Sequence, residues 1–337
     1  SIARGILRNL VVLMRFSDHW TRRLPTVRDV EKLLNDEGGD RRIAPTGSIR
    51  DYFRASSYGQ LDVVSTVLPW ITLSHTEEYY ADGESGTSSK FQEALVEALD
   101  ESSVGLNPSS YSPALYDNDD DGLFDAVMFL HSGYGAEWAK TDCEGNAMAD
   151  RIWAHKWRLD RAWYPRGRGT RLGVKNYHTN SVLWSTCGDE ISRIGTIAHE
   201  LGHILGLPDL YGAGGGIGSY GLMGNSWGFD ESQRYPPSPS AWSKIQLGWA
   251  SPTILTSSGT YAIPSTQTAS DGAIYKIDDG YPSGEYLLIE NRQPTGFDGV
   301  MPQGGLLIWH IDETAPFKSR PGHPDQEDWP ENGNHYR

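Results

Sequence analysis

The chain has 337 residues, 38% of them hydrophobic and 22% charged, which is enough apolar material for a large core in one big domain or two. Acidic residues outnumber basic ones by 44 to 29, and the net charge of −15 argues against nucleic acid as a partner, because a polyanion would be repelled. No apolar run approaches the ~20 residues that a membrane-spanning helix needs, and the first residues lack the apolar segment and cleavage site of a signal peptide.

The first half of the chain mixes strand and helix patterns. A short, mostly aliphatic run bounded by polar residues predicts a buried strand over residues 7–16. Apolar residues then recur at helical spacing over residues 26–34, with Thr26 placed as the N-cap, and again over residues 89–99. Further strands are predicted over residues 61–66, 70–73, 125–130, 152–157 and 181–184.

The pattern changes after residue 250. Short β-rich runs separated by Gly, Pro and Asp turns predict strands over residues 260–263, 273–277, 285–290 and 305–311. We therefore expect an α/β (α+β) domain with a twisted mixed sheet over residues 1–250, followed by a β-rich C-terminal module over residues 251–337.

Residues 189–205 predict an amphipathic helix that carries a metal motif. His199 and His203 are four residues apart, so they lie one turn apart on the same face, where both imidazoles can reach one zinc ion at about 2.0–2.1 Å. Glu200 stands beside the first ligand, where its carboxylate can take a proton from zinc-activated water and pass it to a leaving amine. These three residues predict zinc-dependent hydrolysis.

A third zinc ligand is expected soon after the helix. Gly206 can adopt the positive φ that ends a helix, and Asp209 follows three residues later, where its carboxylate can complete a site that leaves the fourth position to water. Asp209 has an alternative role as a cap of the turn at Pro208. Glu231 is its main rival as the third ligand.

The pattern His-Glu-x-x-His-x-x-Gly-x-x-Asp resembles the elongated motif of metzincins, with aspartate in place of the usual third histidine. Metzincins place a methionine in a tight turn beneath the metal. Residues 220–224 fit such a turn, which makes Met223 the candidate; the alternative is a methionine that fills a gap in the core.

Much of the chain resembles the immune inhibitor A family of secreted metallopeptidases. The resemblance is carried by residues 198–203 and 206–211, the Met223 turn and residues 240–249. Flanking segments agree with it, namely residues 48–53, 57–59, 152–157, 287–292 and 305–312.

The resemblance implies a secreted zinc endopeptidase with a metzincin-like catalytic domain, made with an inhibitory propeptide, often stabilised by calcium, and acting on protein or peptide substrates. Carried over by position, His199, His203 and Asp209 bind zinc and Glu200 is catalytic. Members of the family commonly continue past the last residue of this chain. We therefore expect a truncated or processed form that begins near Ser1.

An acidic segment predicts a calcium loop, with Gly122 at position 6 for the sharp turn. Position 12 is Met128, which excludes a complete EF-hand, and the alternative is an acidic surface turn. The candidate ligands at positions 1, 3, 5, 7 and 9 are the side chains of Asp117, Asp119, Asp121 and Asp125 and the carbonyl of Leu123.

Other residues carry less specific predictions. Cys143 and Cys187 are expected to form a disulfide if the protein is extracellular, and to be two separate buried thiols if it is not. His155 and His310 are expected to be core or hydrogen-bonded histidines. The donor to the tetrahedral oxyanion is left open among Tyr211, Tyr220 and Tyr235.

Two rival functions follow from the same residues. One is a surface adhesion or carbohydrate-binding protein that retains the zinc helix for structure, although an intact Glu200 argues against it. The other is a metal-dependent hydrolase of a non-peptide bond. A peptide substrate is expected to lie as an added strand along a sheet edge, which we place at residues 181–184.

Overall fold

The computed structural model describes residues 2–102, 115–165, 172–211 and 216–313. The end of the predicted C-terminal module, residues 314–337, lies outside these ranges. No helix in the described ranges combines the length and the apolar character that crossing a membrane requires.

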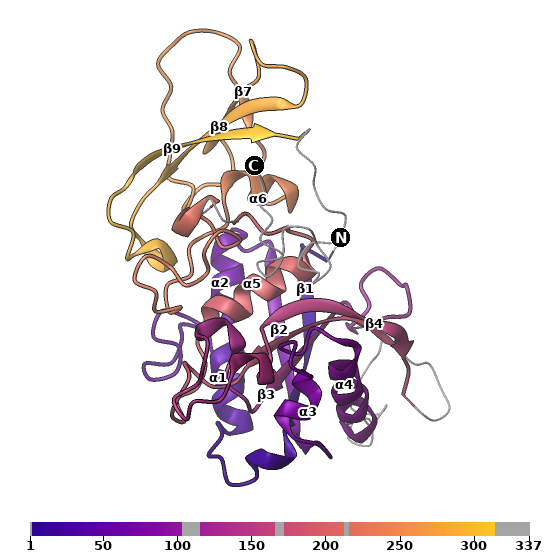
Figure 1. The fold of residues 1–337 in the computed structure, drawn as a ribbon. Helices are drawn as coiled ribbons and strands as arrows, with labels where there is room; N and C mark the ends of the chain where they lie inside the picture. Colours follow the sequence, from indigo (N-terminus) through magenta and orange to yellow (C-terminus); the bar gives the residue numbers. More distant parts are fainter. Residues whose placement is uncertain (1, 103–114, 166–171, 212–215, 314–337) are drawn as a thin grey trace.

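A five-stranded mixed sheet forms the centre of the α/β part (Figure 1). Its strand order is β2-β1-β3-β5-β4, in which β2, β1, β3 and β5 are parallel and the edge strand β4 is antiparallel to β5. The strands are β1 (Gly5–Arg15), β2 (Leu61–Thr72), β3 (Ala126–His131), β4 (His155–Trp163) and β5 (Val174–Ser181).

Helices cover both faces of this sheet. Because alternate residues of β1 point to opposite faces, β1 contributes to a hydrophobic cluster on each face. Leu7, Val11 and Leu13 pack into one hydrophobic cluster with α1, α2 and α5. Leu10 and Val12 pack into a second cluster with α3 and α4. The helices are α1 (Val27–Asn35), α2 (Ile49–Ser56), α3 (Glu77–Ala81), α4 (Ser89–Ser102), α5 (Ile194–Ile204) and α6 (Ala241–Gln246). Short 3-10 helices span Ser17–His19, Ala136–Trp138, Met148–Asp150, Gly218–Tyr220 and Gly296–Asp298.

A second sheet of four strands, β6-β7-β8-β9, lies beyond α6 at the top of Figure 1. It contains β6 (Thr253–Ile254), β7 (Ile274–Ile277), β8 (Glu285–Arg292) and β9 (Gly305–Asp312). A mixed α/β part followed by a β-rich part is therefore confirmed.

A buried ionic cluster joins the second sheet to α6. The guanidinium of Arg292 pairs with Glu290 at 3.1 Å and with Asp298 at 3.2 Å, and all three side chains are buried. Lys244 of α6 is buried nearby and donates to the Tyr58 hydroxyl and the Thr266 carbonyl, each at 3.1 Å. Burial is the main reason that the pKa of Lys244 falls to about 8. Charged groups from both sides of residue 250 thus meet in one core.

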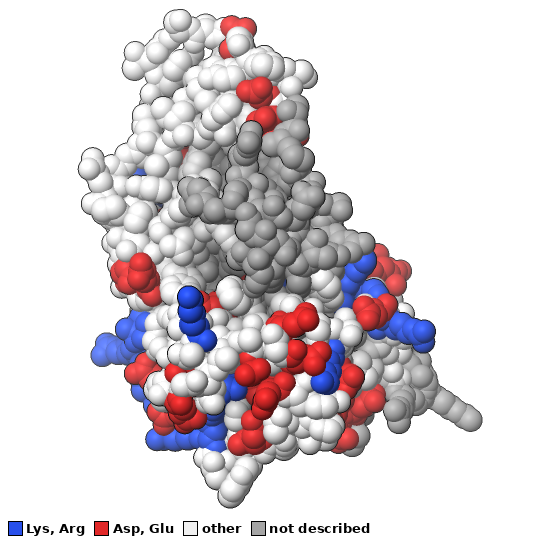
Figure 2. Space-filling view, in the orientation of Figure 1, with Lys and Arg blue, Asp and Glu red and all other residues white. Residues whose placement is uncertain are grey.

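Charges on the face shown in Figure 2 do not segregate by sign. Lysine and arginine side chains alternate with aspartate and glutamate over the α/β part, and fewer charged side chains lie over the second sheet. The described residues on this face therefore form no basic patch for a polyanion.

Two of the predicted strands are wrong, and one predicted helix begins later than expected. Residues 181–184 are not a strand, because β5 ends where the Ser181 hydroxyl accepts the backbone N–H of Leu183 at 2.9 Å and turns the chain. The zinc-motif helix begins at Ile194 rather than at residue 189, because Ile191 pairs with Leu183 as a β-bridge. Residues 260–263 form no strand, and Tyr261 instead bonds within its own loop to the Ser257 carbonyl at 2.7 Å.

Candidate active site

Three buried side chains converge beside the C-terminal half of α5. The Nε2 atoms of His199 and His203 lie 3.1 Å apart, and Oδ1 of Asp209 lies 3.0 Å from the first and 3.1 Å from the second. The three distances are close to the spacing of about 3.3 Å that is expected between donor atoms of a tetrahedral zinc site with bonds of about 2.0–2.1 Å. The structure thus brings together the three residues predicted as zinc ligands.

Backbone carbonyls orient both imidazoles. Nδ1 of His199 lies 3.1 Å from the Leu222 carbonyl, and Nδ1 of His203 lies 2.7 Å from the Leu207 carbonyl. A carbonyl only accepts, so each Nδ1 carries a proton and each Nε2 is directed at Asp209. Such second contacts fix the tautomer that metal-binding histidines need.

The end of α5 sets the position of Asp209. Gly206 has a φ of 98°, and the N–H of Leu207 donates to the Gly202 carbonyl at 3.0 Å, which reverses the chain as in a Schellman motif. The predicted role of Gly206 at the helix end is confirmed. The reversal returns Asp209, which is fully buried, to the face that carries both histidines.

Met223 lies in a tight turn against the same helix. The N–H of Gly224 donates to the Gly221 carbonyl at 2.9 Å, and the Met223 carbonyl accepts the N–H of Leu210 at 2.8 Å. A Cβ at Gly202 would lie 2.7 Å from the Met223 sulfur, so the two residues are in contact. The turn also supplies the Leu222 carbonyl that orients His199. The Met223 turn therefore packs against the helix that carries both histidines.

The electrostatics of these residues fit a cation. Apart from the two imidazoles, no group in the described ranges donates a hydrogen bond to either carboxylate oxygen of Asp209. Burial alone would lower the pKa of His199, but its hydrogen bond to Asp209 and the charge of that carboxylate outweigh burial and raise the pKa to about 9. The site thus requires a positive charge, which a divalent metal supplies more fully than one proton.

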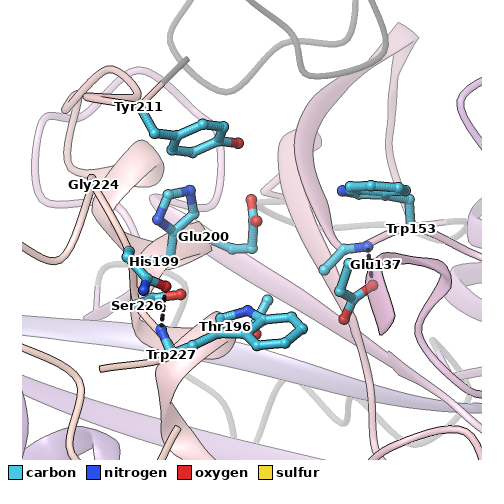
Figure 3. Close-up of a pocket in the computed structure, with 11 residues that line it drawn as sticks. Glu137, Trp153, Thr196, His199, Glu200, Tyr211, Gly224, Ser226 and Trp227 are labelled. Carbon is cyan, nitrogen blue, oxygen red and sulfur yellow. Dashed lines mark hydrogen bonds between the residues drawn. The ribbon is translucent and has the colours of Figure 1, made fainter. Parts of the chain in front are cut away.

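Glu200 faces the pocket beside this site. The pocket has a volume of about 240 Å³ and is lined by His199, Glu200 and Tyr211 on one side and by Glu137 and Trp153 on the other (Figure 3). Burial raises the pKa of Glu200, and its Oε2 atom has no hydrogen-bond partner in the described ranges. A buried carboxylate with a raised pKa is suited to exchanging protons.

A disulfide holds the segment that carries Glu137 and Trp153. Cys143 and Cys187 are bonded, with their Cα atoms 5.7 Å apart, which confirms the predicted bridge. Tyr134 adds a hydrogen bond from its hydroxyl to the Gly188 carbonyl at 3.0 Å. These links join the loop after β3 to the loop before α5.

Arg151 anchors the same segment from within. Its guanidinium lies 2.7 Å from Asp142 and 3.3 Å from Glu77, which is fully buried at the start of α3. His19 lies 3.5 Å from Glu77. Burial outweighs the attraction of Arg151 and raises the pKa of Glu77 to about 8, and burial lowers the pKa of His19 to about 4.

The acidic loop lies next to the C-terminal end of the zinc-motif helix. Carboxylate oxygens of Asp117, Asp119 and Asp125 lie within 4.8 Å of one another. A cavity of about 230 Å³ is lined by Asp119, Asp121, Leu123 and Asp125 together with His203, Ile204 and Gly206. Asp121 instead accepts the backbone N–H of Leu123 at 2.8 Å.

The remaining candidates lie elsewhere. Glu231 is exposed and is not grouped with the histidines. Of the three tyrosines, only Tyr211 lines the pocket, and Tyr220 packs on Phe229 with ring centroids 5.0 Å apart. His155 is buried and bonded to the Trp153 carbonyl at 2.7 Å, as expected, and His310 pairs with Glu285 at 3.1 Å. Sequence reasoning missed Glu137, Trp153 and Trp227.

Comparison with known protein families shows the family to which the chain belongs. The sequence model described as immune inhibitor A peptidase M6, catalytic domain, matches residues 44–250, which is more than half of the chain. The chain belongs to the M6 immune inhibitor A peptidases. This assignment makes it a member of a zinc metallopeptidase family and confirms the resemblance found in the sequence.

Two relatives show how far the similarity extends. Immune inhibitor A of Bacillus thuringiensis subsp. alesti is 30% identical over an alignment of 204 positions, which covers 53% of this chain and 28% of the relative. Pre-pro-metalloprotease PrtV of Vibrio cholerae serotype O1 is 28% identical over an alignment of 239 positions, which covers 63% of this chain and 25% of the relative. The matches thus span about a quarter of the curated relatives.

Proposed function

We propose that the chain is a zinc endopeptidase of protein and peptide substrates, with His199, His203 and Asp209 as metal ligands and Glu200 as general base and acid. The observation that carries the proposal is the triangle of donor atoms, 3.0–3.1 Å on each edge, with the Glu200 carboxylate in the adjoining pocket. When bound there, zinc polarises the scissile carbonyl and lowers the pKa of the attacking water.

The residues of the chain perform the remaining steps. Glu200 accepts the proton of the attacking water and delivers it to the leaving amine, which its burial and raised pKa support. Tyr211 is the candidate to donate a hydrogen bond to the developing oxyanion, because it alone of the three predicted tyrosines lines the pocket.

We place the substrate along β4 rather than along residues 181–184. β5 is paired on both sides, with β3 and with β4, so it has no free edge for another strand. β4 is the edge strand, and Trp153 and Ala154, which immediately precede it, line the pocket beside Glu200. A peptide added to β4 would therefore pass over the catalytic glutamate.

A structural zinc site in an adhesion protein is the less supported alternative. A purely structural site closes the fourth position with a protein ligand, whereas here the pocket reaches His199 and Glu200. The disulfide, and the word pre-pro in the name of one relative, support the further proposal that the chain is secreted and made with a propeptide.

Calcium at the acidic loop is a separate proposal. Three carboxylates within 4.8 Å repel one another, and the charges of Asp119 and Asp117 add to burial in raising the pKa of Asp125. A calcium ion bound by oxygens of Asp117, Asp119, Asp125 and the neighbouring loop would remove that repulsion.

Substitution of Glu200 tests the peptidase proposal. Glu200→Ala should retain one zinc ion per chain and lose casein hydrolysis by roughly 10²–10⁴-fold, since the proton transfer is removed and the ligands are not. Glu231→Ala, at an exposed glutamate, is the matched control and should retain activity. Casein hydrolysis that survives Glu200→Ala would show that the mechanism is wrong.

A further inference from the structure

A second carboxylate lines the active-site pocket and has no role in the steps above. Glu137 lies in the 3-10 helix Ala136–Trp138 after β3, and Figure 3 shows it beneath Trp153, on the opposite side of the pocket from His199. Its carboxylate accepts the N–H of Ala154 at 3.3 Å. No ion pair joins it to a lysine, arginine or histidine in the described ranges.

The surrounding backbone fixes the position of Glu137. The N–H of Ala136 donates to the Ile152 carbonyl at 3.1 Å, and Trp138 packs between Trp184 and Trp227 with ring centroids 4.3 and 4.5 Å away. A Cβ at Gly135 would lie 2.3 Å from a carboxylate oxygen of Glu137. Gly135 therefore leaves the space that this carboxylate occupies.

The chemistry around Glu137 matches a cationic side chain. Trp153 and Trp227 line the pocket with it, and indole faces attract cations as a carboxylate does. The volume of about 240 Å³ is below the ~300 Å³ at which pockets begin to hold drug-sized ligands, so a single side chain is the appropriate occupant. Burial, with a smaller contribution from the nearby charge of Glu200, raises the pKa of Glu137 to about 7. A bound cation would stabilise the ionised carboxylate and so offset this effect.

We propose that Glu137 determines substrate specificity by pairing with an arginine or lysine side chain at one of the two residues that flank the scissile bond. The inference rests on the proposed peptidase function. Arginine is the better match of the two, because its planar guanidinium binds a carboxylate through two hydrogen bonds and stacks on indole. The net charge of −15 would also attract cationic substrates.

The test uses the zinc-loaded enzyme and separates the effect of the substrate side chain's charge from the effect of its shape. Cleavage of a denatured protein digest is first mapped by mass spectrometry to find the flanking position at which arginine and lysine are enriched. Fluorogenic peptides are then made that differ only at that position, arginine in one and its neutral isostere citrulline in the other. Wild type, Glu137→Gln and Glu144→Gln are compared, the last being an exposed glutamate of the same segment.

The expected result is a preference of about 10- to 100-fold in kcat/KM for arginine over citrulline, which Glu137→Gln removes and Glu144→Gln retains. The citrulline comparison on wild type stands even if the Glu137 variant does not fold. An active wild type with no enrichment of basic residues, or with equal rates for the two peptides, would overturn this inference alone. A wild type that cleaves no peptide would overturn the proposed function and this inference with it.

Discussion

The sulfur of Met223 rests against Gly202, the residue of α5 that immediately precedes His203. The absence of a side chain at Gly202 allows this contact, because a Cβ there would lie 2.7 Å from the sulfur. The same turn presents the Leu222 carbonyl to His199. The packing of the Met223 turn against α5 and the orientation of His199, a proposed zinc ligand, are therefore connected.

Gly202→Ala should lower the free energy of unfolding by about 1–3 kcal/mol and weaken zinc binding, because the new methyl group displaces the Met223 turn. Urea unfolding and zinc titration measure the two effects. Met223→Ala removes the opposing sulfur, so the double variant should lose less than the sum of the single variants. Strictly additive losses would show that the two side chains do not interact.

Asp209→Asn should reduce zinc affinity by more than the roughly 10- to 100-fold that loss of an outer hydrogen-bonding partner costs, because an anionic ligand is replaced by a neutral amide. Competition with a chromophoric chelator provides the measurement. Glu231→Gln is the matched control, since that carboxylate is exposed and is not grouped with the histidines. A larger loss in the Glu231 variant would reassign the third ligand.

Calcium added to metal-stripped protein should release heat in calorimetry and raise the melting temperature, with about 2.7 kcal/mol of stabilisation at a hundredfold excess over Kd. Asp119→Asn should weaken both signals, because it removes one of the three clustered carboxylates. Asp120→Asn, in the same loop at a φ of 60° that asparagine tolerates, should leave them in place. If wild type shows no heat and no shift in melting temperature, calcium does not bind at this loop.

The buried Glu77 should make stability depend on pH. Its pKa of about 8 lies above the ~4.3 of an exposed glutamate, so the folded state holds a proton that the unfolded chain has released. The stability that the protonated Glu77 contributes is full below the unfolded pKa, and it is lost as pH rises from there to the folded pKa of about 8. Relative to Glu77→Gln, wild type should lose about 2 kcal/mol between pH 6.5 and 8.

Urea unfolding of both proteins at several pH values in this window checks the Glu77 prediction. The window lies above the lowered pKa of His19, about 4, so that histidine stays neutral in the folded protein. Glu144→Gln controls for the loss of one exposed carboxylate. A difference between wild type and Glu77→Gln that is constant with pH would contradict the prediction.

The sequence predicts those parts of the site whose geometry is local. His199 and His203 share a helix face because of their spacing, and Gly206 and Asp209 follow within one chain reversal. Glu137 has no such signal. It reaches the pocket because β3 and β5 are neighbours in the sheet, a pairing of residues about 50 positions apart that no short motif encodes.

The same distinction explains the errors in the fold. The strands β1 and β3 are buried on both faces, and their continuous aliphatic runs identify them. The segment at residues 181–184 is equally apolar, but one hydroxyl contact from Ser181 to the N–H of Leu183 turns it out of the sheet. The helix α2 was missed although Ser48 and Asp51 form a capping box at its start, because only eight residues follow.

The ionic cluster around Arg292 limits how the chain can be divided. The boundary predicted at residue 250 stays a prediction, and the family match also ends there, yet removal of everything beyond it would delete Glu290, Arg292 and Asp298. Lys244 would then lose the favourable charges of Glu290 and Asp298 and the Thr266 carbonyl to which it donates. For recombinant shortening or for swapping parts between homologues, the smallest exchangeable block is therefore the two sheets together.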